Sequence, residues 1–181
     1  MHTMHGVVSL LDSTHYQLVA DLWAELKREF GVAGAYATPY PHFSYQVAAD
    51  YDEASLEPIL QRFALNHAPF QITTTGLGIF TGSVSVLYIP VLRSQHLTQF
   101  HQALWPEIST AAAGIQDYYR PEFWMPHITL AMHDLNSDNL SRIVQQLSKR
   151  TFNWQIHIDN IALIYDTGTK QELRCRYDLN G

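Results

Sequence analysis

The sequence predicts an α+β fold: a duplicated α/β unit that forms two lobes, with two antiparallel sheets facing a central groove and helices on the outside. Two observations lead to this prediction. Segments with strand-like apolar patterns are interspersed with segments of helical period over the 181 residues. The order of these segments in the first half of the chain recurs in the second half. A chain of this length suits one domain, so we expect a single domain over residues 1–181.

The first half of the chain is expected to alternate strands and helices. Leucines recur every fourth position from Leu18 and end at Phe30, which is the spacing of one helix face. Asp12 and Ser13 precede this segment and offer a cap for its first turn. The expected elements are a strand at 6–11, a helix at 14–30, a loop at 31–41, a strand at 42–49, a helix at 52–66 and a strand at 69–80.

The second half is expected to follow the same order. Thr81-Gly82 joins two strand-like runs and predicts a hairpin, and Asp166-Thr167-Gly168 predicts another near the end of the sequence. The expected elements are a strand at 83–92, a helix at 94–113, a loop at 114–126, a strand at 127–133, a helix at 137–149 and strands at 152–165 and 171–179.

The duplication is visible in matched landmarks. Pro41-His42 returns as Pro126-His127, an offset of 85 residues, and the helices expected near 52 and 137 have the same offset. The strand at 70–80 returns at 153–163 with an offset of 83 residues. We therefore expect lobe-forming repeats at about 5–80 and 83–165, with a closing strand at 171–179. A pseudo-twofold arrangement of this kind brings equivalent residues to one central groove.

Composition and charge exclude several classes of protein. The formal net charge is −6, which argues against a partner such as long nucleic acid, whose phosphates require a basic face. No apolar run approaches the roughly 20 residues that span a membrane, and the N-terminus lacks the pattern of a secretory signal. Cys175 is the only cysteine, so no disulfide forms within the chain, and we expect a cytoplasmic protein.

The residues that carry chemistry follow the two Pro-His pairs. Side chains alternate between the two faces of a strand, so His42 shares a face with Ser44, and His127 shares a face with Thr129. The opposite faces are apolar and suit packing under helices. We expect those faces to carry Phe43, Tyr45 and Val47 in one strand and Ile128, Leu130 and Met132 in the other.

Two imidazoles and two hydroxyls at one groove suit displacement at phosphorus. Near neutral pH one imidazole can be a general base and the other a general acid, while the hydroxyls donate to non-bridging phosphate oxygens. This scheme requires no metal and no other cofactor. The other histidines do not predict a metal site either: His96 and His101 face different ways on one helix, and His133 lies about 20 Å along its strand from His127.

Paired His-x-Ser/Thr-x tetrapeptides, one in each half of a chain of this size, resemble those of the 2H phosphoesterases, which include 2'-5' RNA ligase-like and cyclic phosphodiesterase proteins. The matching tetrapeptides are His42-Phe43-Ser44-Tyr45 and His127-Ile128-Thr129-Leu130. The resemblance implies a bilobal 2H phosphoesterase-like fold and metal-independent hydrolysis of 2',3'-cyclic phosphates or 2'-5' linkages in a nucleotide or RNA end. It places the catalytic pair on His42 and His127 and the phosphate-binding hydroxyls on Ser44 and Thr129.

Further residues admit two interpretations each. Tyr88 is either a core aromatic or a groove residue that stacks a base or donates to phosphate. Arg120 forms an aromatic-basic loop with Tyr118, Tyr119 and Trp124, and this loop either covers the groove and stacks a nucleobase or packs against the protein. His2 and His5 are expected in a frayed N-terminal tail.

The function also has alternatives. The fold could bind nucleotides or RNA ends without turnover, or join RNA by the reverse reaction in a 2'-5' RNA ligase. A further alternative is a phosphoesterase that acts on a small non-nucleotide cyclic phosphate. The sequence does not predict the oligomeric state or the exact substrate.

Overall fold

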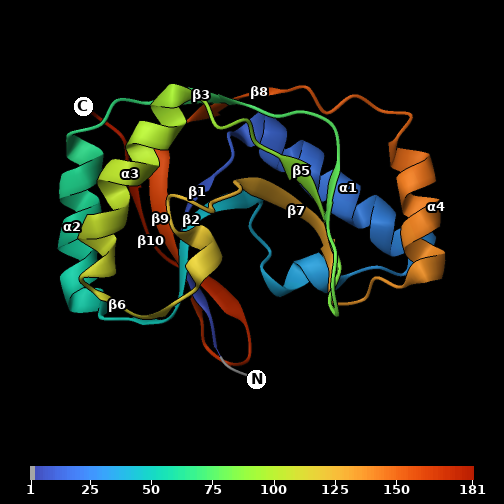
Figure 1. Ribbon diagram of the computed structural model, residues 1–181, viewed down its shortest axis with the longest axis horizontal. Coiled ribbons are helices and arrows are strands. Elements are labelled where there is room, and N and C mark those ends of the chain that lie inside the picture. The colour runs from blue at the N-terminus through green and yellow to red at the C-terminus, as the bar shows by residue number, and fades with distance from the viewer. Residues whose placement is uncertain (1–2) are drawn as a thin grey trace.

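The computed structural model describes residues 3–181 and shows two lobes side by side, with a narrow two-stranded sheet above them (Figure 1). All strand pairs are antiparallel, and the helices cover the outer sides of the lobes (Figure 1). The α+β class predicted from the sequence is confirmed. No helix among residues 3–181 is long and apolar enough to span a bilayer.

The larger lobe is built on a five-stranded sheet with the order β10-β9-β1-β2-β6. Helices α2 (Glu53–Leu65) and α3 (Gln95–Ser109) pack against this sheet and against each other. Its strands are β1 (His5–Leu10), β2 (His42–Tyr51), β6 (Ala112–Ile115), β9 (Asn160–Asp166) and β10 (Gln171–Asp178).

The smaller lobe has a three-stranded sheet with the order β4-β5-β7. Helix α1 (Ser13–Phe30) packs against β7, and α4 (Ser137–Leu147) packs against α1. The strands of this lobe are β4 (Gly78–Phe80), β5 (Val86–Pro90) and β7 (His127–Met132).

The two lobes do not coincide with the two sequence repeats. The order of elements is duplicated as expected, but β9 of the second repeat pairs with β1, and β4 of the first repeat pairs with β5. Helices are exchanged as well, because α1 packs on β7 and α3 packs on β2. The expectation that 5–80 and 83–165 each form a lobe was therefore wrong: each lobe is completed by elements from the other half.

The strands predicted at 69–80 and 152–165 are each broken in two. Their first parts, β3 (Phe70–Thr73) and β8 (Gln155–Ile158), pair with each other in the separate two-stranded sheet. The break after β3 contains Gly76 at a φ of 56°, a left-handed conformation that glycine adopts without strain. The predicted hairpins survive as β4–β5 and β9–β10.

The helix predicted to end at residue 113 ends at Ser109, and β6 follows it as an edge strand beside β2. The small residues Ala112–Ile115 pair with β2, and Gly114 adopts a φ of 65° within this strand, which glycine does without strain. The loops at 31–41 and 114–126 contain short 3-10 helices, η1 (Gly34–Ala37) and η2 (Asp117–Tyr119).

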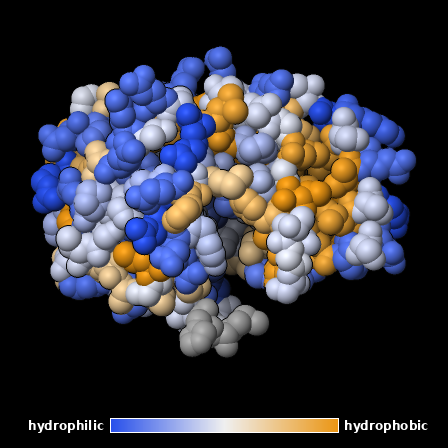
Figure 2. Space-filling model, viewed as in Figure 1, coloured by the Kyte–Doolittle hydropathy of each residue, from blue (hydrophilic) through white to orange (hydrophobic). Residues whose placement is uncertain are grey.

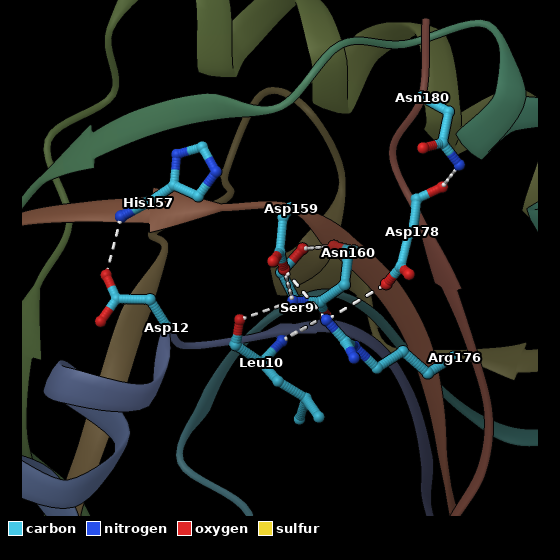
Figure 3. A network of polar contacts seen from close by, with 9 residues as sticks. All are labelled: Ser9, Leu10, Asp12, His157, Asp159, Asn160, Arg176, Asp178 and Asn180. Atoms are coloured by element: carbon cyan, nitrogen blue, oxygen red, sulfur yellow. Dashed lines mark hydrogen bonds and ion pairs between the residues drawn. The ribbon is translucent and has the colours of Figure 1, made fainter.

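Polar contacts hold the ends of β1, β8 and β9 together (Figure 3). The Asn160 amide accepts a hydrogen bond from the Leu10 backbone N–H and donates one to the Leu10 carbonyl, each at 2.9 Å. Asp12 caps α1 as predicted by accepting from the backbone N–H of His15, and its other oxygen accepts from the backbone N–H of His157 at 2.9 Å. These bonds fix where α1 leaves the larger lobe and enters the smaller one.

Candidate active site

Strands β2 and β7 begin with the two predicted motifs and lie next to each other where the lobes meet. Their first six residues have the same burial pattern, in which His42, Ser44, His127 and Thr129 are half-buried and the residues between them are buried. The alternation expected from the sequence is therefore present at both histidine–hydroxyl pairs.

A β-bulge falls on the last residue of each tetrapeptide. Along the β1–β2 pair, Val7 is opposite Gln46 and Val8 is opposite Ser44, so Tyr45 is the extra residue. Along the β5–β7 pair, the register shifts in the same way and Leu130 is the extra residue. A bulge reverses the facing of the residues after it.

The bulges correct one prediction. Val47 and Met132, expected on the apolar faces with the residues under the helices, instead line the groove. Gln46, which simple alternation places on the groove face, is fully buried and accepts a hydrogen bond from Tyr51. In both repeats, one bulged residue interrupts the alternation of side chains between the two faces of the strand.

A cavity of about 600 Å³ lies between the lobes and is lined by both histidines and both hydroxyl residues. Figure 2 shows the surface hollowed between the two lobes. This volume is within the range of pockets that bind small ligands. The two motifs, 85 residues apart in the sequence, thus meet at one groove, as the duplication predicted.

Each imidazole is held by the same backbone contact. The Nδ1 atom of His42 is 2.5 Å from the carbonyl oxygen of Tyr40, and Nδ1 of His127 is 2.7 Å from the carbonyl oxygen of Met125. Because a carbonyl only accepts, Nδ1 carries the proton and donates in both rings. In the neutral tautomer Nε2 is then the unprotonated, basic atom of each ring, and it can accept a proton from a bound ligand.

Burial shifts the pKa of both histidines downward. Desolvation lowers the pKa of His42 to about 4; the Tyr40 carbonyl opposes this shift, and a positive charge on His127 adds to it. Desolvation also lowers the pKa of His127, opposed by its bond to the Met125 carbonyl. Charge on one ring therefore disfavours charge on the other, and desolvation favours the neutral form of both rings near pH 7.

Two buried tryptophans bind the backbone of the hydroxyl residues. The indole N–H of Trp124 donates to the Ser44 carbonyl at 2.8 Å, and that of Trp23, on α1, donates to the Thr129 carbonyl at 3.0 Å. Trp124 is 1% exposed and stacks on His101 with 3.9 Å between ring centres. The structure places Trp124 in the core beneath the motif, so the interpretation that it stacks a nucleobase is not supported.

Tyr88 and Arg120 also lie outside the cavity lining. Tyr88 is 6% exposed, stacks on Phe80 and lies 5.1 Å from the His127 ring, so it supports that imidazole from behind. A Cβ on Gly78 would come within 2.4 Å of the Tyr88 ring, so this close packing requires glycine at that position. The Arg120 guanidinium lies 3.7 Å from the Glu122 carboxylate on the surface.

His5 was expected in a frayed tail and instead begins β1 as a buried residue. Its Nδ1 accepts a hydrogen bond from the backbone N–H of Asp166 at 2.9 Å, and its ring stacks on Tyr165. Pairing with the end of β9 fixes this segment, a long-range contact that local sequence does not reveal. His2 lies outside the described residues.

The sequence indicates Tyr119 only as a member of the aromatic-basic loop, and sequence reasoning missed its position beside Ser44. This residue on η2 lines the cavity, and burial raises the pKa of its hydroxyl to about 12, with Tyr118 adding to the shift and the Ser44 side chain opposing it. The phenol stays protonated at neutral pH and lies beside a motif hydroxyl. Its place between Tyr118 and Arg120 in a loop was visible in the sequence, but the direction of its side chain was not.

Residues 3–181 contain no cluster of three or more His, Cys, Asp or Glu side chains that could hold a metal ion. The protonatable groups at the centre of the cavity are the two motif imidazoles, with Tyr119 beside Ser44. The arrangement can accept one proton, donate another and hydrogen-bond an anion between them.

The sequence profile of the 2'-5' RNA ligase superfamily matches residues 14–170, which include both motif strands. The chain belongs to this superfamily. The resemblance to 2H phosphoesterases drawn from the two tetrapeptides is thereby confirmed. Among curated protein sequences, none matches the chain significantly.

Solved structures share the fold of this 2'-5' RNA ligase superfamily member. The protein TT0787 of Thermus thermophilus aligns over 98% of both chains with a TM-score of 0.69 and 16% identity. E. coli LigT, complexed with 3'-AMP, aligns over 99% of both chains with a TM-score of 0.62 and 14% identity. At these identities the likeness shows a common fold, and the bilobal 2H phosphoesterase-like architecture expected from the sequence is confirmed.

Proposed function

We propose that the protein hydrolyses a 2',3'-cyclic phosphate or a 2'-5' phosphodiester in a nucleotide or short RNA end. His42 and His127 act as its general base and acid, and Ser44 and Thr129 bind the phosphate. The observation that carries this proposal is the matched pair of imidazoles: each donates from Nδ1 to a backbone carbonyl and each lines the same cavity. Membership of the 2'-5' RNA ligase superfamily and the 3'-AMP complex of LigT support a nucleotide ligand.

In the cyclic case, a water oxygen bonds to phosphorus while the bond from phosphorus to one ribose oxygen breaks. The base takes a proton from the water, and the acid gives a proton to the departing ribose oxygen, so one water is consumed and a phosphomonoester forms. The Ser44 and Thr129 hydroxyls donate to the non-bridging oxygens, where negative charge grows in the transition state.

The roles follow from the environments of the two rings. Desolvation and the neighbouring charge of His127 hold the pKa of His42 near 4, so His42 is neutral and able to act as the base. A bound phosphate anion raises the pKa of a nearby imidazole, which favours protonation of His127 as the acid. One proton is then shared by the pair, as acid–base catalysis requires.

The test is turnover of a nucleoside 2',3'-cyclic phosphate by the purified chain with EDTA present, followed by chromatography of the product. We expect a 2'- or 3'-phosphomonoester and a rate unchanged by the chelator. Loss of turnover with EDTA would refute the metal-independent mechanism. Saturable binding without product over hours would favour a non-catalytic binding protein.

A further inference from the structure

The lining of the groove is uniform in chemical character. Among residues 3–181, the side chains that line it are aliphatic, aromatic, hydroxyl, amide and imidazole groups, and every lysine, arginine, aspartate and glutamate lies elsewhere. Apart from the histidines, no lining group changes its charge near neutral pH. His5, His42 and His127 all line the groove, and burial lowers the pKa of each. The electrostatic attraction available to a ligand therefore comes from an imidazole that becomes protonated when the anion binds.

Most of the cationic side chains are engaged in contacts away from the groove. Arg93 donates to the backbone carbonyls of Trp124 and Pro121 and so supports the loop before β7. Seven others form ion pairs on the outer surface: Arg28 with Glu29, Arg62 with Glu107, Arg120 with Glu122, Arg150 with Glu25, Lys170 with Glu172, Arg174 with Glu53 and Arg176 with Asp159.

The rim of the groove carries large exposed apolar side chains. Tyr118, Phe123 and Met125 are 67%, 64% and 57% exposed, and all three line the cavity from the loop that precedes His127. We call these three residues the aromatic rim. Exposed apolar side chains gathered at a cavity mark a surface that a ligand covers. Flat bases stack on such side chains with little dependence on charge.

Resting on the proposed function, we infer that the groove selects a nucleoside-type phosphodiester that carries a single negative charge, with its base on the aromatic rim. A second phosphate on the substrate, such as a 5'-phosphate, loses its hydration on entering the groove and meets no cation there. The protein therefore discriminates against 5'-phosphorylated substrates and recognises the nucleoside by stacking.

The same charge argument applies to the product. A cyclic phosphodiester carries one negative charge, whereas the monoester formed from it carries nearly two near pH 7, because its second pKa is about 6. The second negative charge of the monoester finds no further cation in the groove, where one protonated imidazole already faces the first charge. We expect the product to bind more weakly than the substrate.

Three substrates test the inference with the full-length chain. They are adenosine 2',3'-cyclic phosphate, its 5'-phosphorylated form, and methyl riboside 2',3'-cyclic phosphate, which lacks the base. We expect the 5'-phosphate to lower kcat/KM by at least about tenfold, and loss of the base to raise KM by about 5- to 100-fold. Equal or faster turnover of the 5'-phosphorylated substrate would overturn the charge argument.

Variants separate stacking from charge. Phe123→Ser and Tyr118→Ser should raise KM for the adenosine substrate and leave KM for the base-free substrate nearly unchanged. Leu65→Ser is the matched control, because Leu65 is 57% exposed on α2 and lies outside the cavity lining. Arg120→Gln should leave the 5'-phosphate penalty unchanged. A change in that penalty would show that Arg120 reaches the ligand, contrary to the inference.

Failure of the inference is distinguishable from failure of the proposed function. If none of the three compounds is hydrolysed, the proposed hydrolysis of 2',3'-cyclic phosphates fails, and calorimetric affinities of the same compounds then test selectivity independently. The expected order of affinity is adenosine cyclic phosphate first, with the other two at least about tenfold weaker. An affinity that falls steeply with added salt would also contradict the inference, because it indicates several cation contacts.

Discussion

Trp124 donates a hydrogen bond to the backbone carbonyl of Ser44, although the two residues are 80 positions apart in the sequence. Trp23 does the same for Thr129 from a helix of the opposite repeat. A buried indole thus fixes the backbone of each motif directly behind the groove, while a carbonyl two residues before each histidine fixes its ring. The candidate site is held in the same way on both sides, by an indole contact that crosses the halves of the chain and by a local contact between the imidazole and a backbone carbonyl.

Replacing either motif histidine should remove most of the activity. His42→Ala and His127→Ala are each expected to lower kcat by at least about 10²- to 10⁴-fold, the usual contribution of a general acid or base. The double variant should be little slower than either single one, because the two rings act as a unit. Steady-state kinetics on a cyclic nucleotide would measure this. If the double variant lost activity by the product of the two single losses in kcat, the two rings would act independently.

The motif hydroxyls should contribute to the transition state rather than to folding. Ser44→Ala and Thr129→Val remove one donor each, and we expect kcat to fall by about 10²- to 10³-fold. Ser83→Ala, at an exposed turn residue, is the control. A change in KM alone would assign these hydroxyls to ground-state binding.

Loss of a tryptophan N–H should weaken both stability and catalysis. Trp124→Phe keeps the stacking surface but leaves the Ser44 carbonyl without its donor, which should cost about 1–3 kcal/mol in the free energy of unfolding. A displaced Ser44 should lower kcat more than it raises KM. Trp105→Phe serves as the control, since Trp105 is half-buried and packs edge-on against His101. Urea unfolding would measure the stability of both variants, and steady-state kinetics would measure their kcat and KM. Equal effects in Trp124→Phe and Trp105→Phe would refute the role of Trp124 in positioning Ser44.

Tyr119 is predicted to help bind the phosphate. Its phenol remains protonated because burial raises its pKa to about 12, and it lies beside Ser44. Tyr119→Phe should lower kcat/KM by about tenfold if the hydroxyl donates to the anion. Unchanged kinetics in this variant would reduce Tyr119 to a packing residue of the loop.

The pH optimum of kcat/KM should lie below the pKa of a free imidazole, which is about 6.5. The pKa of His42 is lowered to about 4, so the base stays neutral and active well below pH 6.5. The pKa of His127 is lowered as well, so its acidic form is lost early as pH rises in the free enzyme. The profile of kcat/KM against pH should therefore peak below neutrality. The profile of kcat should peak at a higher pH, because the bound anion raises the pKa values of both histidines. An optimum above pH 8 would contradict the assignment.

Stability should fall as the solution is acidified from pH 6.5 towards 4. Burial lowers the pKa of His101 to about 4, opposed by its bond to the Tyr45 carbonyl and assisted by Arg93. The unfolded chain binds a proton in this range and the folded chain does not, so each such histidine costs up to about 1.4 kcal/mol per pH unit. His101→Gln should flatten the curve of unfolding free energy against pH. An unchanged slope would show that His101 does not titrate differently on unfolding.

Local patterns were enough to predict most of the elements and the faces of the histidine–hydroxyl pairs, but not β6, the breaks in two strands or the bulges. Apolar spacing located α1, and Asp12 was identified as its cap. The paired Pro-His-x-hydroxyl segments indicated that His42, Ser44, His127 and Thr129 face one groove, and all four line the cavity. These predictions hold because helix period, strand alternation and capping depend on residues within one or two turns of each other.

The sequence by itself therefore determined the order of strands and helices, the duplication, and which side chains of each motif share a face. Only the tertiary structure decided the exchange of β4, β9 and the two long helices between lobes, the bulges that turn Val47 and Met132 into the groove, and the burial of Trp124. The physical reason is that pairing and packing between residues about 80 or more positions apart select among arrangements that local preferences leave equally favourable.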